Sequence, residues 1–169
     1  MVVLDDRLVS SQRSRRDVEY YLTELLEKTR STCVVLIDKN GLFLHGVGKL
    51  EIVDTTALAA LVAGSYAATL ELVRLLGEDR ISILFQQGDK WSIQVSLVGE
   101  DAMMVIIFKE EASIGLVRLH ANKVTRHIIP LLSSTYEEQY EESGEPRQPI
   151  DLDKFKEYAT NLIDKILRD

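Results

Sequence analysis

The segment nearest to a nucleotide-binding signature is G-V-G-K-L at residues 46–50. A phosphate-binding loop of this type requires glycine at position 43 and Ser or Thr at position 50, where this chain has Phe43 and Leu50. The glycines also do not open a helix directly after a strand, as a dinucleotide-binding turn does. The sequence therefore predicts no nucleotide site here, and these glycines are interpreted as a strand exit.

Histidine and cysteine offer little further chemistry. His45, His120 and His127 are too scattered for a metal signature, although the last two lie two turns apart on one predicted helix. Cys33, the single cysteine, lies inside the apolar run T-C-V-V-L-I and is predicted to be a small core residue. We expect no metal ion and no cofactor.

Paired glutamates at 137–138 and 141–142 are the remaining candidates for acid-base work. They lie in a polar, proline-bearing stretch that would leave them hydrated and unable to hold a shifted pKa. No Ser/His/Asp or Cys/His arrangement is visible. We therefore expect a protein without an active site of its own, that is, not an enzyme.

The size and charge of the chain suit one domain with a tail. It has 169 residues and a formal net charge of −7, which argues against nucleic-acid binding. The N-terminus shows no secretory signal, so we expect a cytoplasmic protein.

The rest of the chain is organised around a helix predicted over residues 54–77. Asp54 is placed to cap its start and Gly77 to close its end. Polar residues from Ser65 onward interrupt it, so we expect no membrane insertion. One stripe is bulky and is predicted to face the chain's own core: Leu58, Leu61, Val62, Leu72 and Leu76.

The opposite stripe of this helix is small and would let another backbone approach closely. It consists of Ala60, Gly64, Ala67 and Glu71, flanked by Ala63 and Ala68. A helix that is apolar nearly all round should be covered nearly all round. We interpret the small stripe as an interface, with an ordinary internal helix pair as the open alternative.

The other elements are predicted from periodicity and turn residues. A helix runs from Ser14 to about Arg30, and the turn D-K-N-G at 38–41 joins strands at 32–37 and 42–45. Three antiparallel strands follow at 81–86, 91–97 and 102–108. A last core helix starts after Ser113 and bends or ends near Pro130. An acidic linker is predicted at 133–149, and an amphipathic helix at 150–169.

The order helix, two strands, helix, three strands, helix resembles the Roadblock family over residues 14–132. Four segments look like its bacterial MglB-like branch: V-V-L-I-D-K-N-G-L, D-T-T-A-L-A-A-L-V-A-G-S-Y-A-A, L-L-G-E and S-I-G-L-V-R-L-H-A-N-K. The resemblance implies a Roadblock/profilin-like α/β sandwich with a five-stranded antiparallel sheet between helices, plus a C-terminal helix.

The resemblance also implies a function in cell polarity or motility. A homodimer, joined through the 54–77 helices and the 81–86 strands, would bind a Ras-like small GTPase of MglA type. It would stimulate hydrolysis by repositioning the GTPase's own catalytic residues. The partner-binding residues expected are Ala60, Ala63, Gly64, Ala67, Ala68 and Glu71, with Phe155, Leu162 and Ile166 from the C-terminal helix. A non-catalytic Roadblock scaffold is the alternative, and a small-ligand sensor a third class.

Overall fold

The computed structural model describes residues 12–143, with side chains described for residues 14–132. The chain order is α1 (Gln12–Thr29), β1 (Cys33–Asp38), β2 (Phe43–Gly48), a 3-10 turn (Leu50–Ile52), α2 (Thr55–Arg74), β3 (Ile83–Gln87), β4 (Ser92–Val98), β5 (Ala102–Phe108) and α3 (Ile114–Ser143). This is the α/β element order expected for a Roadblock/profilin-like domain. The predicted C-terminal helix at 150–169 lies outside the described residues.

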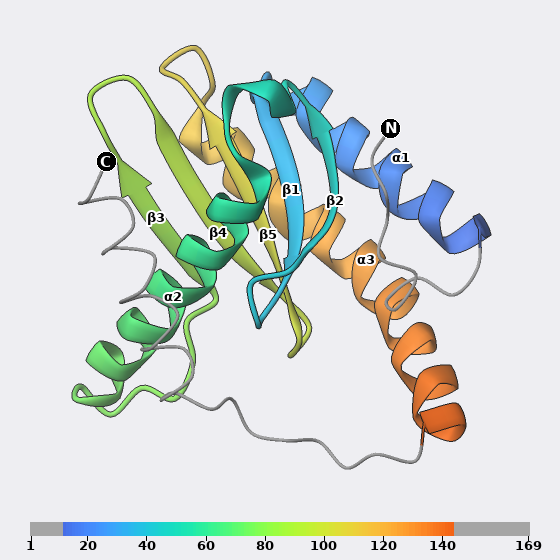
Figure 1. Ribbon diagram of the computed structural model, residues 1–169. Helices are drawn as coiled ribbons and strands as arrows, with labels where there is room; N and C mark the ends of the chain where they lie inside the picture. Colours follow the sequence, from blue (N-terminus) through green and yellow to red (C-terminus); the bar gives the residue numbers. More distant parts are fainter. Residues whose placement is uncertain (1–11, 144–169) are drawn as a thin grey trace, which may run out of the picture.

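The five strands form one antiparallel sheet in the order β2-β1-β5-β4-β3 (Figure 1). All six side chains of β1 and all seven of β5 are buried. Strands that are apolar on both faces need cover on both faces, which explains why these two lie inside the sheet.

The β1–β2 hairpin closes as its turn sequence predicts. Asp38 Oδ1 accepts hydrogen bonds from the backbone N–H groups of Asn40 (2.9 Å) and Leu42 (2.8 Å). Gly41 has φ +86°, a conformation that favours glycine. Burial raises the pKa of the Asp38 carboxyl, while the backbone N–H donors counteract this.

Helices cover the sheet unequally. α1 and α3 lie together on one face and α2 lies alone on the other (Figure 1). The α1/α3 side is the larger core, and it includes Val18, Leu22, Met104, Phe108 and Ile128. The α2 side is smaller, so α2 is the only described helix on its face of the sheet.

Helices also cover the polar side of β4. The polar side of β4 is buried, with Gln94 at 0% and Ser96 at 3% exposure, because it faces the α1/α3 layer. The two side chains satisfy each other in part, since Gln94 Nε2 donates to Ser96 Oγ at 3.1 Å.

Helix α3 does not end near Pro130 but continues to Ser143, so residues 133–143, which were predicted to be linker, are helical. Buried Ile128 and Leu132 hold the helix to the core on both sides of the proline.

Candidate partner-binding face

Helix α2 has well-defined ends. Asp54 Oδ1 accepts hydrogen bonds from the N–H groups of Thr56 (3.0 Å) and Ala57 (3.1 Å), as a capping carboxylate does. At the other end Gly77 has φ +82° and donates to the Arg74 carbonyl, and Glu78 donates to the Val73 carbonyl. These two bonds form a Schellman motif. The boundaries predicted from Asp54 and Gly77 are confirmed.

The side of α2 that packs on the sheet differs from the predicted one. Leu58 and Val62 are buried as expected, together with Ala59 and Ala63. The last two are small, so the helix axis can lie close to a sheet face built from larger residues such as Val35, Val105 and Met103.

The other three members of the predicted core stripe point away from the sheet. Leu61 and Leu72 are each 61% exposed and Leu76 is 79% exposed. The prediction that they face the chain's own core is therefore wrong. That prediction assumed that the bulkiest stripe of an apolar helix faces the core. In this structure α2 packs close to the sheet, and alanines occupy part of the contact.

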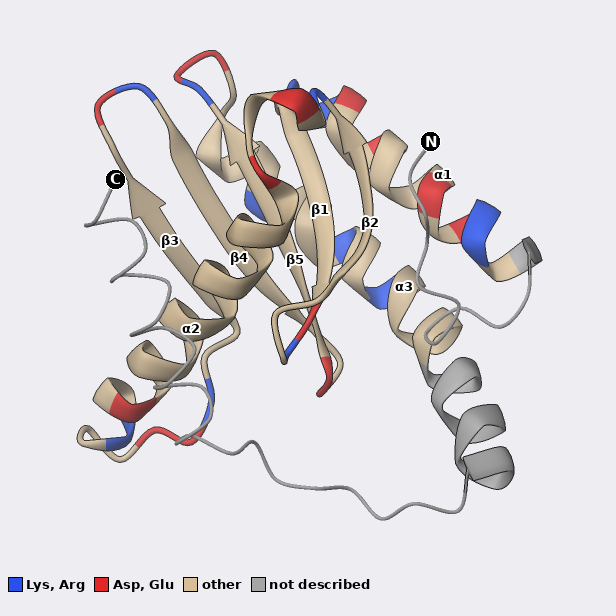
Figure 2. Ribbon diagram, in the orientation of Figure 1, with Lys and Arg blue, Asp and Glu red and all other residues tan. Residues whose placement is uncertain are grey.

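An apolar surface remains on the side opposite the sheet. We call it the outer face of α2 and define it as Leu61, Gly64, Ala68, Leu72 and Leu75, which recur at helical spacing. Leu75 is 83% exposed, Ala68 is exposed and Gly64 is half-buried. Charge is confined to the end of the helix, where Glu71 pairs with Arg74 (Figure 2). An exposed apolar strip of this kind is typical of a protein interface.

The six predicted partner-binding residues on this helix do not form one surface. Ala63 is 5% exposed and belongs to the core beneath α2, so it is removed from any exposed surface. Ala60, Gly64 and Ala67 are half-buried, and Ala68 and Glu71 are exposed. Ala60 lies against the β1–β2 turn, since a Cβ at Gly41 would come within 3.0 Å of its Cα. Phe155, Leu162 and Ile166 lie outside the described residues.

Four exposed leucines were not predicted as surface residues: Leu61, Leu72, Leu75 and Leu76. The signal for them was the apolar character of α2 all round its circumference. That pattern predicts that a second surface, besides the sheet, covers the helix, but it does not indicate which side of the helix contacts which surface.

Strand β3 borders the same surface. It is an edge strand that pairs only with β4, so its other backbone edge is unpaired within the described chain. Two hydrogen bonds fix α2 to this region: Tyr66 OH donates to the Ile81 carbonyl at 2.8 Å, and Gln86 Nε2 donates to Ser65 Oγ at 3.1 Å. Burial raises the pKa of the Tyr66 phenol, which keeps it a neutral donor. Helix and edge strand therefore present one connected surface.

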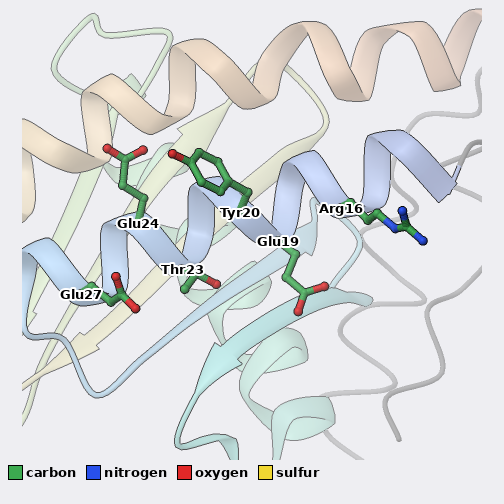
Figure 3. A pocket seen from close by; sticks show the side chains of 6 residues that line it. All are labelled: Arg16, Glu19, Tyr20, Thr23, Glu24 and Glu27. Atoms are coloured by element: carbon green, nitrogen blue, oxygen red, sulfur yellow. The ribbon is translucent and has the colours of Figure 1, made fainter.

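A hollow of about 440 Å³ on α1 does not form a small-molecule site. Its lining consists of Arg16, Glu19, Tyr20, Thr23, Glu24 and Glu27. In Figure 3 the side chains diverge, with Tyr20 and Glu24 directed toward α3, Glu19 toward β2 and Arg16 away from both. A ligand site needs polar groups that converge on one point. Within the described residues no group of three or more His, Cys, Asp or Glu side chains is placed to hold a metal ion.

By length and composition α2, which has 20 residues, is the one described helix that could cross a membrane. Core helices of soluble proteins pass the same test. Here one side of the helix packs on the sheet through Leu58, Ala59, Val62 and Ala63.

Comparison with known proteins agrees with this architecture. The Roadblock/LC7 domain profile matches residues 19–108. MglB of Myxococcus xanthus is 33% identical, with a TM-score of 0.66 over 69% of this chain and 95% of that chain. The gliding protein MglB of Thermus thermophilus is 31% identical, with a TM-score of 0.70 over 79% of this chain and 99% of that chain. An MglB structure with a tetrameric arrangement is 30% identical, with a TM-score of 0.71 over the same shares. No curated protein sequence matches the chain significantly.

The sheet with helices on both faces and an apolar outer face on α2 defines a small α/β module of the Roadblock/profilin-like class. The chain belongs to the Roadblock/LC7 family, and the structures similar to it at 30–33% identity are MglB proteins, which supports the MglB-like branch.

Proposed function

We propose that this protein is a cytoplasmic homodimeric regulator that binds a Ras-like GTPase of MglA type and stimulates its GTP hydrolysis. It would supply no catalytic group itself and would act by positioning the GTPase's own catalytic residues. The observation that carries the proposal is the exposed apolar outer face of α2 in a chain similar to MglB.

Self-association is the first step of the proposal. The outer face of α2 and the free edge of β3 lie next to each other, so a second copy could cover the leucines and extend the sheet at once. A two-fold arrangement would place the two α2 helices side by side, because such an interface uses the same patch on both copies. The pair would form one continuous platform.

Stimulation would then come from preorganisation. A rigid platform that binds the GTP-loaded conformation fixes mobile catalytic groups near the γ-phosphate and lowers the barrier by electrostatic positioning. Glu71 lies at the end of the platform, exposed and paired only with Arg74 among the described residues. It is suited to pair with a basic group on the GTPase.

Arginine substitutions test the assignment of the surface. Gly64→Arg and Glu71→Arg should leave the fold intact but abolish stimulation of single-turnover GTP hydrolysis by an MglA-type GTPase. A buried, unpaired charge costs several kcal/mol at an interface. Leu116→Arg is the matched control, since Leu116 is 46% exposed on α3, which lies on the opposite face of the sheet from α2 (Figure 1). Full stimulation by both α2 variants would move the GTPase-binding surface elsewhere.

Mass measurements on the same variants separate two steps. A folded monomer with no stimulation would show that the residue acts through self-association. A folded dimer with no stimulation would show that it acts at the GTPase. A dimer that binds the GTP-loaded GTPase without accelerating hydrolysis would favour the scaffold function.

Truncation after Ser143 tests the C-terminal segment. Among the described side chains, the buried ones run as far as Leu132. We expect an unchanged melting temperature and weaker binding of the GTPase. A large fall in melting temperature would show that residues 144–169 belong to the core.

A further inference from the structure

Helix α3 has an exposed side that the proposed function does not use. Its inner side packs against the sheet and α1 through buried residues that include Val117, Ala121 and Val124. Its outer side carries Leu119, which is 62% exposed. α3 lies on the face of the sheet opposite α2 (Figure 1). A partner bound to this side would therefore leave the outer face of α2 free.

A hollow of about 550 Å³ lies along the exposed side of α3, and we call it the α3 hollow. It is lined by Leu119, Asn122, Lys123, Arg126 and His127. These positions follow the helix for about two turns. The His127 ring is held in place by stacking on Tyr21 of α1, with ring centroids 4.7 Å apart and planes at 3°. Leu119 and the methylene stems of the lysine and the arginine make the hollow apolar beneath its charges.

The charges along this side of α3 are positive. Between residues 114 and 132 the charged side chains are Arg118, Lys123 and Arg126, with no acidic residue (Figure 2). None of the three forms an ion pair with another described residue. Positive charge is therefore available to a partner, in a chain whose net charge is −7.

Carboxylates of α1 lie beside this positive charge. Glu24 is close enough to interact with the charge of Lys123, but its ion pair is with Lys28. Glu24 and Glu27 also line the separate hollow on α1. A flat anionic surface such as a membrane would bring its headgroups up to these glutamates as well as to the cations, and like charges repel. A narrow anionic partner that contacts α3 alone avoids this repulsion.

We propose that the α3 hollow binds an acidic amphipathic helix of another protein. Apolar side chains on one side of that helix contact Leu119 and the stems of Lys123 and Arg126. Aspartates or glutamates that flank its apolar side pair with the two cations. A helix suits the site because its side chains, spaced three or four residues apart, can follow α3 as ridges fit into grooves. The inference does not depend on the proposed function, because the two surfaces lie on opposite faces of the sheet (Figure 1).

Two synthetic peptides of opposite charge test the inference. Each has about 16 residues, which is long enough to form a helix. Both carry the same row of leucines, flanked by glutamates in one peptide and by lysines in the other. Fluorescence anisotropy measures their binding to the full chain. The glutamate peptide should bind at least about tenfold more tightly, because attraction to two exposed cations replaces repulsion from them. High salt should reduce this preference by screening.

Charge reversal in the α3 hollow locates the binding site. Lys123→Glu with Arg126→Glu should invert the preference, so that the lysine peptide binds more tightly. Arg80→Glu with Lys90→Glu is the matched control, since it makes the same change in net charge at exposed residues that flank the edge strand β3. The control should keep the wild-type preference. Leu119→Ser should weaken both peptides, because it removes apolar contact from the hollow.

The opposite results would overturn the inference. Equal binding of the two peptides to the wild type would do so, as would an unchanged preference in the reversed variant or an inverted one in the control. A reversed variant with half the wild-type mass would instead make a second copy the occupant. Wild-type chain that sediments with phosphatidylglycerol vesicles but ignores the glutamate peptide would make the occupant a membrane.

Circular dichroism reports whether each variant folds. If the reversed variant fails to fold, nuclear magnetic resonance of the wild type decides. Addition of the glutamate peptide should shift the amide signals of residues 119–127 most strongly. Shifts centred on another element would also overturn the inference.

Discussion

Replacing two outer leucines of α2 is the sharpest test of its reversed orientation. Leu61→Ser with Leu72→Ser removes two large apolar side chains, each of which is 61% exposed in the single chain. Both already face away from the core, so the free energy of unfolding of the single chain should change by no more than about 0.5 kcal/mol each. Any large effect must come from an interface.

The size of that effect follows from the exposed area. Fully burying a leucine is worth about 1.5–3 kcal/mol, so covering the exposed three-fifths is worth about 1–2 kcal/mol. A two-fold interface counts each substitution twice, and four leucines then contribute about 4–8 kcal/mol. The dissociation constant should rise by roughly three to six orders of magnitude.

Sedimentation over a concentration series measures this constant. Leu116→Ser is the matched control, because Leu116 is 46% exposed on α3, on the opposite face of the sheet from α2, and should leave association unchanged. The reasoning is refuted if the double variant keeps its fold and associates as tightly as the wild type. It is also refuted if the variant unfolds, since that would place these leucines in the core.

Three further predictions concern the described core. Burial raises the pKa of the Cys33 thiol to about 11, so a thiol reagent at neutral pH should react only after unfolding; rapid reaction of the native protein would contradict this. Burial lowers the pKa of His45, and Glu19 opposes this shift. The unfolded chain therefore binds the proton more readily than the folded chain. The free energy of unfolding should fall as the pH drops below about 6.5. His45→Leu should flatten the dependence of the melting temperature on pH between about 7.5 and 5.5, and an unchanged slope would exclude His45 as its source. Gly48→Ala should lower the free energy of unfolding, measured in denaturant melts, far more than Gly77→Ala. Both glycines have a positive φ, which costs an alanine about 1–3 kcal/mol. Only at Gly48 would the added Cβ also meet a backbone oxygen, at 2.5 Å. Equal losses would contradict the close contact.

Local signals in the sequence predicted most of the fold. Asp54 and Gly77 fix the ends of α2 by capping chemistry that needs no tertiary contact. The turn at 38–41 fixes the hairpin, and the unbroken apolar runs of β1 and β5 place them inside the sheet. Such features depend only on neighbouring residues.

The orientation of α2 could not be predicted in this way. Its apolar residues surround the axis, so periodicity alone gives no preferred side. The shape of the sheet selected Ala59 and Ala63 for the contact and left Leu61 and Leu72 outside. The predicted interface on α2 stays a prediction, but Ala63 is buried against the sheet and is excluded from it.

The course of α3 beyond Pro130 has a similar cause. Proline removes one intrahelical hydrogen bond, which predicts an end or a bend. Burial of Ile128 and Leu132 on either side keeps the helix on the core, and the exposed ring points away from it. Tertiary packing thus outweighs a local signal that is normally reliable.

The central claim is that this protein stimulates a GTPase. Single-turnover GTP hydrolysis by an MglA-type GTPase, measured with saturating amounts of this chain and without it, tests the claim directly. We expect acceleration of at least about 100-fold, since groups positioned on the γ-phosphate are worth roughly 10³–10⁵ in rate. A rate that does not change while the GTP-loaded GTPase binds would contradict the account and make the protein a scaffold.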